Sequence, residues 1–162
     1  MTLYPKRKQI RLESKLYRGP VSVSLTMCFC NGIDVVKGKL ADTIAEKLLY
    51  LQDRYKAIIY AYCILPDHMH ILLGLQDDKH NVLGFVKHFK RTVSIALKGQ
   101  CPQKQLWQDR FYDHILRRDE DVDRHARYIL ENPLRKGLVK DFLEYKYIGG
   151  SYLQSLKENQ RT

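Results

Sequence analysis

The residues best suited to chemistry are two histidines in the stretch PDHMH, residues 66–70. Successive side chains of a β-strand point to opposite faces, so His68 and His70 would share one face and Met69 would lie on the other. Two neutral imidazoles would then converge on one point. The spacing alone favours an ordinary pair of half-exposed histidines on an edge strand, so support for a functional role must come from other residues.

A tyrosine and an asparagine in the stretch RYILENPLR form a second candidate. Residues 119–131 have helical periodicity, and Pro133 is expected to end the helix. The side predicted to be buried carries Val122, Ala126 and Ile129. Tyr128 lies beside that stripe, and Asn132 projects one turn later on the same side as Tyr128. A phenol and an amide oxygen could therefore reach the same small volume.

Charge indicates the kind of partner. The chain has 162 residues, with 28 lysines and arginines against 18 acidic residues, and a net charge of +10. Such an excess favours a polyanion, most often nucleic acid. Two basic clusters are expected to contact it: Lys87, Lys90, Arg91 and Lys98 on one predicted helix, and Arg117, Arg118, Arg124 and Arg127 near the tyrosine. Taken alone, the first cluster is explained more simply as a solvated helix face, but two clusters in one small domain favour nucleic acid.

Hydrophobic periodicity predicts the elements that position these residues. Strands are expected over 21–29, 57–65, 68–75 and 106–117. Helices are expected from Asp42, capped by Asp42 or Thr43, and over 81–97. The β-α-β-β-α-β order is ferredoxin-like: an α+β fold with an antiparallel sheet and helices on one face, followed by the C-terminal helix that carries Tyr128.

Cysteine usage and hydropathy bear on the compartment. The four cysteines, Cys28, Cys30, Cys63 and Cys101, form no CxxC pair and fit reduced thiols of a cytosolic protein. No window approaches the ~20 apolar residues of a membrane span. We therefore expect a cytoplasmic protein without a membrane partner.

Several short motifs follow one another in a distinctive order. They are Leu65-Pro66-Asp67-His68-Met69-His70, Trp107-Gln108, Arg110-Phe111-Tyr112-Asp113-His114, and Tyr128-Ile129 with Asn132-Pro133, Arg135 and Gly137-Leu138-Val139. Together they resemble the REP-associated tyrosine transposases, which belong to the HUH superfamily of single-tyrosine transposases. The resemblance runs from about Val21 to Val139, and the joint occurrence is far more specific than His-x-His alone.

The resemblance implies an enzyme that cleaves and rejoins single-stranded DNA beside hairpins. By position, His68 and His70 match the metal-binding pair, and Tyr128 matches the nucleophile that forms a 5′-phosphotyrosine. Asn132 takes the place of the polar third ligand, where related insertion-sequence enzymes have glutamine. The implied cofactor is Mg²⁺ or Mn²⁺, of which Mn²⁺ accepts nitrogen ligands more readily.

The resemblance also implies a domain organisation. The catalytic domain is expected over 21–140, between a basic arm at 1–20 and a tail at 141–162. Single-tyrosine relatives occur as monomers and as dimers, so a homodimer with an active site completed in trans is one of two expected arrangements. The main rival is a non-catalytic nucleic-acid-binding module of the same fold. A histidine-triad hydrolase fits poorly, because its third histidine would fall on Leu72.

Overall fold

The chain is built on an antiparallel sheet, seen in a computed structural model that describes residues 14–101, 104–117 and 120–160. The strands are β1 Val21–Phe29, β2 Ile58–Ile64, β3 His68–Leu75, β4 Trp107–Ile115 and β5 Ile148–Gly149, in the spatial order β4-β1-β3-β2-β5. The longer helices are α1 Leu40–Arg54, α2 Val82–Ala96, α3 Val122–Leu130 and α5 Ser151–Asn159. The short helical turns are η1 Ser14–Tyr17, α4 Asn132–Arg135 and η2 Phe142–Glu144.

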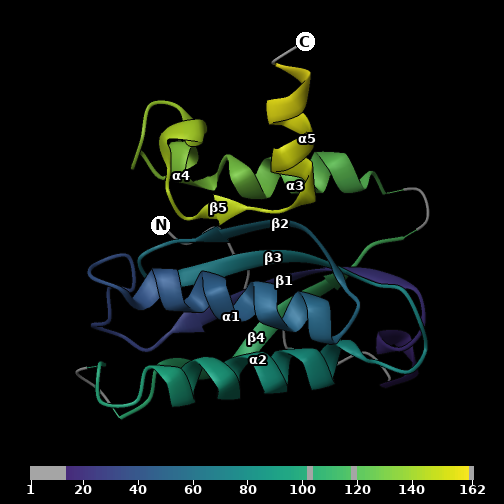
Figure 1. Cartoon of the computed structure of the whole chain (residues 1–162), viewed down its shortest axis with the longest axis horizontal. Coiled ribbons are helices and arrows are strands. Elements are labelled where there is room, and N and C mark those ends of the chain that lie inside the picture. The colour runs from purple at the N-terminus through teal and green to yellow at the C-terminus, as the bar shows by residue number, and fades with distance from the viewer. Residues whose placement is uncertain (1–13, 102–103, 118–119, 161–162) are drawn as a thin grey trace.

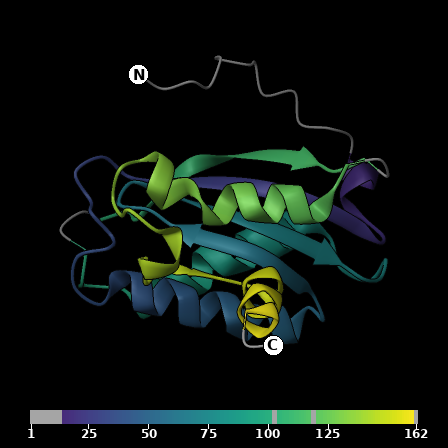
Figure 2. The same ribbon diagram turned by 90° about the horizontal axis from the view of Figure 1, so that it is seen from above.

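Helices lie on both faces of the sheet (Figure 1). α1 and α2 cover one face, whereas α3, α4 and α5 lie on the other, with α3 packed on β2 and β3. Figure 2 looks down on this second layer. The expected α+β architecture is confirmed, and the tyrosine helix lies opposite α1 and α2. Within the described residues, no helix is long and apolar enough to cross a membrane.

Strand alternation explains why the two faces differ. The core beneath α1 and α2 contains Val23, Leu25 and Met27 of β1 together with their β3 partners Leu73, Ile71 and Met69. The intervening residues of β3, among them His68, His70 and Leu72, therefore point to the α3 side. Leu72 packs there with Ala126 and Ile129 of α3.

The first helix differs from its prediction at its start. α1 begins two residues before Asp42, and neither Asp42 nor Thr43 caps it. Lys39 is the N-cap residue and provides no side-chain cap bond. The backbone N–H of Ala41 instead donates to the carbonyl of Val35 at 2.9 Å. A loop carbonyl thus satisfies one of the free N–H groups of the first turn.

The tyrosine helix also has different ends from those predicted. α3 ends at Leu130, and Pro133 lies in the first turn of α4 instead of terminating α3. Proline is tolerated in a first turn because the N–H groups there lack intrahelical partners. Asp121 caps α3 by accepting a hydrogen bond from the N–H of Asp123 at 2.8 Å. The expected start, Asp119, lies outside the described residues.

The segment expected to be a tail contributes to the fold. β5 pairs with β2, and α5 packs on α3 through the small core that contains Leu153. Gly150 joins β5 to α5 with a φ of 117°, and a Cβ there would lie 2.5 Å from the backbone oxygen of Tyr60. The division into arm, domain and tail stays a prediction, and residues 1–13 of the arm lie outside the described part of the chain.

Candidate active site

His68 and His70 lie side by side at the start of β3, on the face covered by α3. Both are buried, with 9% and 4% of their surface exposed, and their rings meet edge to face. Their Nε2 atoms are 3.2 Å apart. Because β3 lies between β1 and β2, the pair is not on an edge strand. The structure therefore brings the two predicted side chains to one point.

Each imidazole is held through its other nitrogen. Thr26 Oγ1 lies 2.8 Å from His70 Nδ1, and Asp67 Oδ1 lies 2.6 Å from His68 Nδ1. Such partners fix the ring orientation, as around metal-bound histidines, and leave the two Nε2 atoms facing each other within hydrogen-bond distance. Neither partner was predicted. Asp67 could have been found from its place beside His68, but Thr26 comes from β1, 44 positions from His70.

Burial also sets the charge of the site. Burial, together with the neighbouring His68 and Lys136, lowers the pKa of His70 to about 3. At neutral pH the His70 ring is therefore uncharged and keeps a lone pair. Burial acts to raise the pKa of Asp67, but the hydrogen bond and charge of His68, with Lys136, outweigh it and lower that pKa. Lys136 follows α4, so the end of α4 lies within electrostatic reach of the pair.

Asn132 is buried at the start of α4, with 5% of its surface exposed. Its amide nitrogen donates to the backbone oxygens of Tyr128 at 3.0 Å and Ile129 at 3.3 Å, in the last turn of α3. Two carbonyl acceptors require the nitrogen at that position. The amide oxygen is thus the atom left to bind another group.

Tyr128 is half-exposed, as expected for a residue beside the buried stripe of α3. Arg135 lies over its ring, with Cζ 4.5 Å from the ring centre. Glu131 holds Arg127 and Arg135 through its two oxygens, each at 2.8 Å. Within the described part of the chain, the phenol oxygen has no hydrogen-bond partner. The stacking of Arg135 on Tyr128 was not predicted, although both belong to the same sequence motif.

The donor set fits a divalent cation. Two imidazole nitrogens 3.2 Å apart, with an amide oxygen available on the same side of the sheet, are ligands that Mn²⁺ accepts. Mg²⁺ prefers oxygen and would rely more on water and phosphate for its remaining ligands. The residues present are therefore compatible with the predicted ion.

A second group of potential metal ligands lies where β4 connects to α3, and the sequence did not point to it. It consists of His114, Glu120 and His125, whose ligating atoms all lie within 4.8 Å of one another. Over the described residues, this is the one group of at least three histidine, cysteine or acidic side chains close enough to share an ion. It includes neither histidine of the His-x-His motif.

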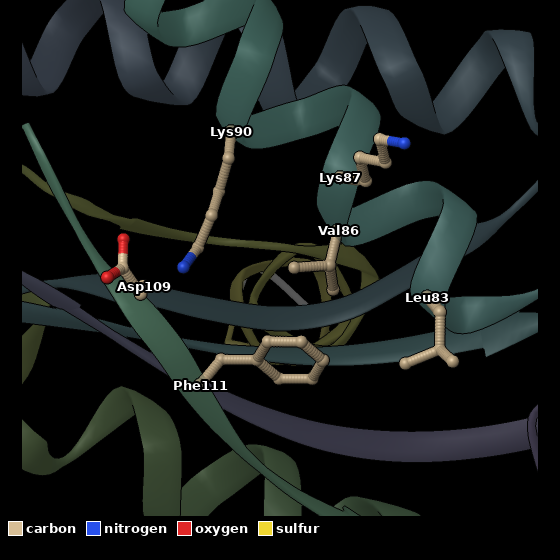
Figure 3. A pocket seen from close by; sticks show the side chains of 6 residues that line it. All are labelled: Leu83, Val86, Lys87, Lys90, Asp109 and Phe111. Atoms are coloured by element: carbon tan, nitrogen blue, oxygen red, sulfur yellow. The ribbon is translucent and has the colours of Figure 1, made fainter.

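The basic stripe on α2 lies on the opposite side of the sheet from the histidine pair (Figure 1). Lys87 and Arg91 are exposed there, whereas Lys98, expected on the same helix, is exposed in the turn that follows its end at Ala96. Lys90 is half-buried and donates to the backbone oxygen of Gln108 in β4 at 2.8 Å, and burial lowers its pKa. Lys87 and Lys90 line a pocket of about 340 Å³ between α2 and β4. Figure 3 shows the side chains that line it. The structure does not bring this stripe to the histidines.

The second basic cluster lies on the side of α3. Arg124 and Arg127 are exposed on that helix, and Arg117 precedes it in the connection from β4. Arg118 lies outside the described residues. The strand register places Tyr112, which is 51% exposed, on the same face of the sheet. Cationic side chains and an exposed aromatic ring therefore share the face that contains the histidine pair.

The structure thus places a buried His-x-His pair and the helix that carries Tyr128 on the same face of an antiparallel sheet. The chain belongs to the IS200-like transposase family, since residues 20–132 match the family "Transposase IS200 like".

Two relatives at about 30% identity support this assignment. The chain is 32% identical over 127 residues to the "Putative REP-associated tyrosine transposase" of Haemophilus influenzae, a match that covers 70% of this chain and 72% of the relative. It is 30% identical over 89 residues to the REP-associated tyrosine transposase of Escherichia coli, covering 55% of this chain and 52% of the relative. The chain thus matches about half the length of the second relative.

A solved structure supports the fold. A REP-associated tyrosine transposase bound to a REP hairpin is similar with a TM-score of 0.70, over 91% of this chain and 82% of that chain. The sequence identity is 22%, so the likeness concerns the architecture.

Proposed function

We propose that the chain cleaves and rejoins single-stranded DNA beside hairpins through a 5′-phosphotyrosine at Tyr128, with Mg²⁺ or Mn²⁺ at His68, His70 and Asn132. The observation that carries the proposal is the histidine pair, whose Nε2 atoms lie 3.2 Å apart while both Nδ1 atoms have partners. Packing alone would not require both rings to present the same nitrogen to one point.

The metal site addresses the charge of the substrate. A phosphodiester is an anion and repels nucleophiles. A divalent ion held by His68, His70 and Asn132 would neutralise part of that charge and polarise phosphorus towards attack. The protein's own part is to hold the two imidazoles in place through Thr26 and Asp67 before DNA arrives.

Tyr128 provides the nucleophile. Its oxygen forms a bond to phosphorus while the bond to the 3′ oxygen breaks, which leaves a 5′-phosphotyrosine and a free 3′-hydroxyl. The phenol proton passes to solvent as the oxygen attacks, and the 3′ oxygen takes up a proton. Arg135 over the ring and exposed Arg124 supply positive charge near the reacting phosphate. In rejoining, a 3′-hydroxyl attacks the phosphotyrosine and releases Tyr128.

The substrate class follows from charge and surface. The net charge of +10 favours a polyanion, and the exposed ring of Tyr112 can stack on an unpaired base. The family match and the hairpin-bound relative support a DNA hairpin as the target. Because Arg117, Arg124 and Arg127 lie on the side of α3, we assign them the main backbone contacts. We assign only secondary contacts with the DNA backbone to the basic stripe on α2.

Covalent capture tests the proposal. The full-length protein, incubated with labelled single-stranded DNA next to a hairpin and with Mn²⁺, should form an adduct that survives denaturing electrophoresis. The adduct should be absent when a chelator is added, when a blunt duplex replaces the single strand, or when the protein carries His68→Ala and His70→Ala. The double variant should still bind DNA in a salt-sensitive manner. Wild-type protein that binds varied hairpins without forming an adduct would contradict the proposal and support a binding module.

A further inference from the structure

The geometry points to a second metal site, formed by His114, Glu120 and His125 and suited to a transition-metal ion such as Zn²⁺, which ties β4 to the start of α3. The site shares no residue with the pair of His68 and His70. It is also independent of the proposed strand transfer, whose chemistry does not require it.

The three side chains converge from different parts of the chain. His114 comes from the end of β4, Glu120 from the connection that follows, and His125 from the first turns of α3. Glu120 Oε1 lies 2.8 Å from His114 Nε2 and 3.7 Å from His125 Nε2. The two rings are stacked at 18°, with centroids 5.9 Å apart. Both imidazoles therefore present Nε2 to the same carboxylate oxygen.

These spacings are close to those of an occupied zinc site. Zn²⁺ bonds nitrogen and oxygen at about 2.0–2.2 Å, which at a tetrahedral angle places neighbouring ligand atoms about 3.4 Å apart. The observed separations of 2.8 Å and 3.7 Å lie on either side of that value. Small side-chain rotations would admit the ion without movement of the strand or helix, and its fourth position would be open to water.

The donors select the class of ion. Two imidazole nitrogens and one carboxylate oxygen favour Zn²⁺ and similar ions over Mg²⁺ and Ca²⁺, which prefer oxygen. The carboxylate of Glu120 is oriented, because its Oε2 accepts a hydrogen bond from the backbone N–H of Arg117 at 2.6 Å. Its ion pairs within the described chain are with His114 and His125. Among the described residues, no lysine or arginine forms an ion pair with Glu120.

The position of the site gives it a structural consequence. His114 is exposed, and Glu120 and His125 are partly exposed, so an ion can enter from solvent without unfolding of the chain. His125 lies three residues before Tyr128 on α3. A bound ion would therefore anchor the tyrosine helix to the edge strand β4. Zn²⁺ should raise the melting temperature and slow amide hydrogen exchange in the first turns of α3.

The experiment is a calorimetric Zn²⁺ titration of full-length, metal-stripped protein that carries His68→Ala and His70→Ala, so that the first pair contributes nothing. We expect one Zn²⁺ per chain in this background. Adding Glu120→Gln should weaken binding at least about tenfold, because loss of even an outer-shell partner typically costs that much. Glu120→Gln preserves volume, so its result stands even if replacement of both His114 and His125 by alanine impairs folding.

Two controls make the result specific. Co²⁺ at a nitrogen and oxygen site gives d–d bands without the charge-transfer band of a thiolate, which separates this site from the four cysteines. His80→Ala removes a histidine elsewhere and should leave Zn²⁺ affinity unchanged. No bound Zn²⁺ in the double-alanine background, or unchanged affinity with Glu120→Gln, overturns the site. If the wild-type protein binds a single Zn²⁺ and only Glu120→Gln abolishes that binding, the result counts against a metal ion at His68 and not against the second site.

Discussion

The two faces of the sheet differ in chemistry although they are formed by the same strands. On β3, Met69, Ile71 and Leu73 are fully buried beneath α1 and α2, in a core of hydrophobic side chains. The alternate positions place His68 and His70 under the layer that contains α3. One strand thus contributes to stability with one set of side chains and to the candidate site with the other.

The difference shows what a buried polar site requires. A buried apolar side chain needs only close packing, but a buried imidazole loses water and must find hydrogen-bond partners. Thr26 and Asp67 provide these partners. The polar face is therefore specified by paired side chains from separate elements, whereas the apolar face is specified by shape and volume.

The largest expected effect is the loss of the nucleophile on the polar face. Tyr128→Phe removes one oxygen with almost no change in volume, so the protein should fold and bind DNA but form no covalent adduct. The control is Tyr112→Phe, which removes another exposed phenol of this face and should keep the adduct. Denaturing electrophoresis with labelled hairpin DNA measures both. An adduct that persists in Tyr128→Phe and disappears in Tyr112→Phe would reassign the nucleophile.

A substitution on the apolar face should act on stability instead. Ile71→Ala leaves a cavity in the core beneath α1 and α2, and we expect a loss of about 2–5 kcal/mol in the free energy of unfolding. The adduct yield of the remaining folded protein should not change. Urea unfolding followed by circular dichroism gives the first quantity and electrophoresis at low temperature the second. A stable Ile71→Ala protein that no longer forms the adduct would contradict the separation of the two faces.

Loss of the hydrogen bond between Thr26 and His70 should have an intermediate effect on metal binding. Thr26→Val keeps the side-chain volume and removes the hydroxyl that lies 2.8 Å from His70 Nδ1. Loss of such a partner typically costs about 10–100-fold in metal affinity or activity. Ser24→Ala, on the same face of β1, is the matched control and should change adduct formation little. The readout is the Mn²⁺ concentration for half-maximal adduct, which should rise only for Thr26→Val.

Basic residues on the two faces should contribute unequally to DNA binding. The logarithm of the single-strand binding constant falls linearly with the logarithm of the salt concentration, by about 0.7 per phosphate contact. Replacing Arg124 and Arg127 by alanine should therefore reduce the size of this slope by about 1.4. Replacing Lys87 and Arg91, on the α2 side, should change the slope less. Fluorescence anisotropy over a range of salt concentrations measures both. Equal changes would mean that DNA contacts both faces.

The smallest effect concerns a buried thiol of the polar face at high pH. Burial raises the pKa of Cys63 from its ordinary value of 9.0 to about 12. Above pH 9 the unfolded chain loses this proton before the folded one, so the thiol's contribution to stability is present below pH 9 and is lost as pH rises towards 12. The loss is at most about 1.4 kcal/mol per pH unit.

Urea unfolding between pH 8 and 11 measures this slope. Cys63→Ala should start from a lower stability and show a flatter decline. Burial also raises the pKa of Tyr145, so the residual slope of the variant reports that phenol and other groups. Identical slopes for wild type and Cys63→Ala would exclude the thiol as the cause.

Much of the fold could be predicted from local pattern. The strand over 21–29 was predicted with the bounds that β1 has, and Asn81 caps α2 at the predicted start, where its side chain accepts a bond from the Gly84 N–H at 2.7 Å. These features depend on side-chain alternation and on hydrogen bonds between near neighbours. The candidate residues His68, His70, Tyr128 and Asn132 could be singled out because several short motifs occur together in one order, since the His-x-His spacing alone is not specific.

The tertiary structure decided the rest. That Thr26 supports His70, that the α2 stripe lies across the sheet from the histidines, and that His114, Glu120 and His125 meet all follow from strand order and helix placement. Alternation and helical periodicity state which face of an element a residue occupies, but not which other element that face meets. That choice is made by the packing of the whole core, because side chains from distant positions converge only when the strands and helices are assembled.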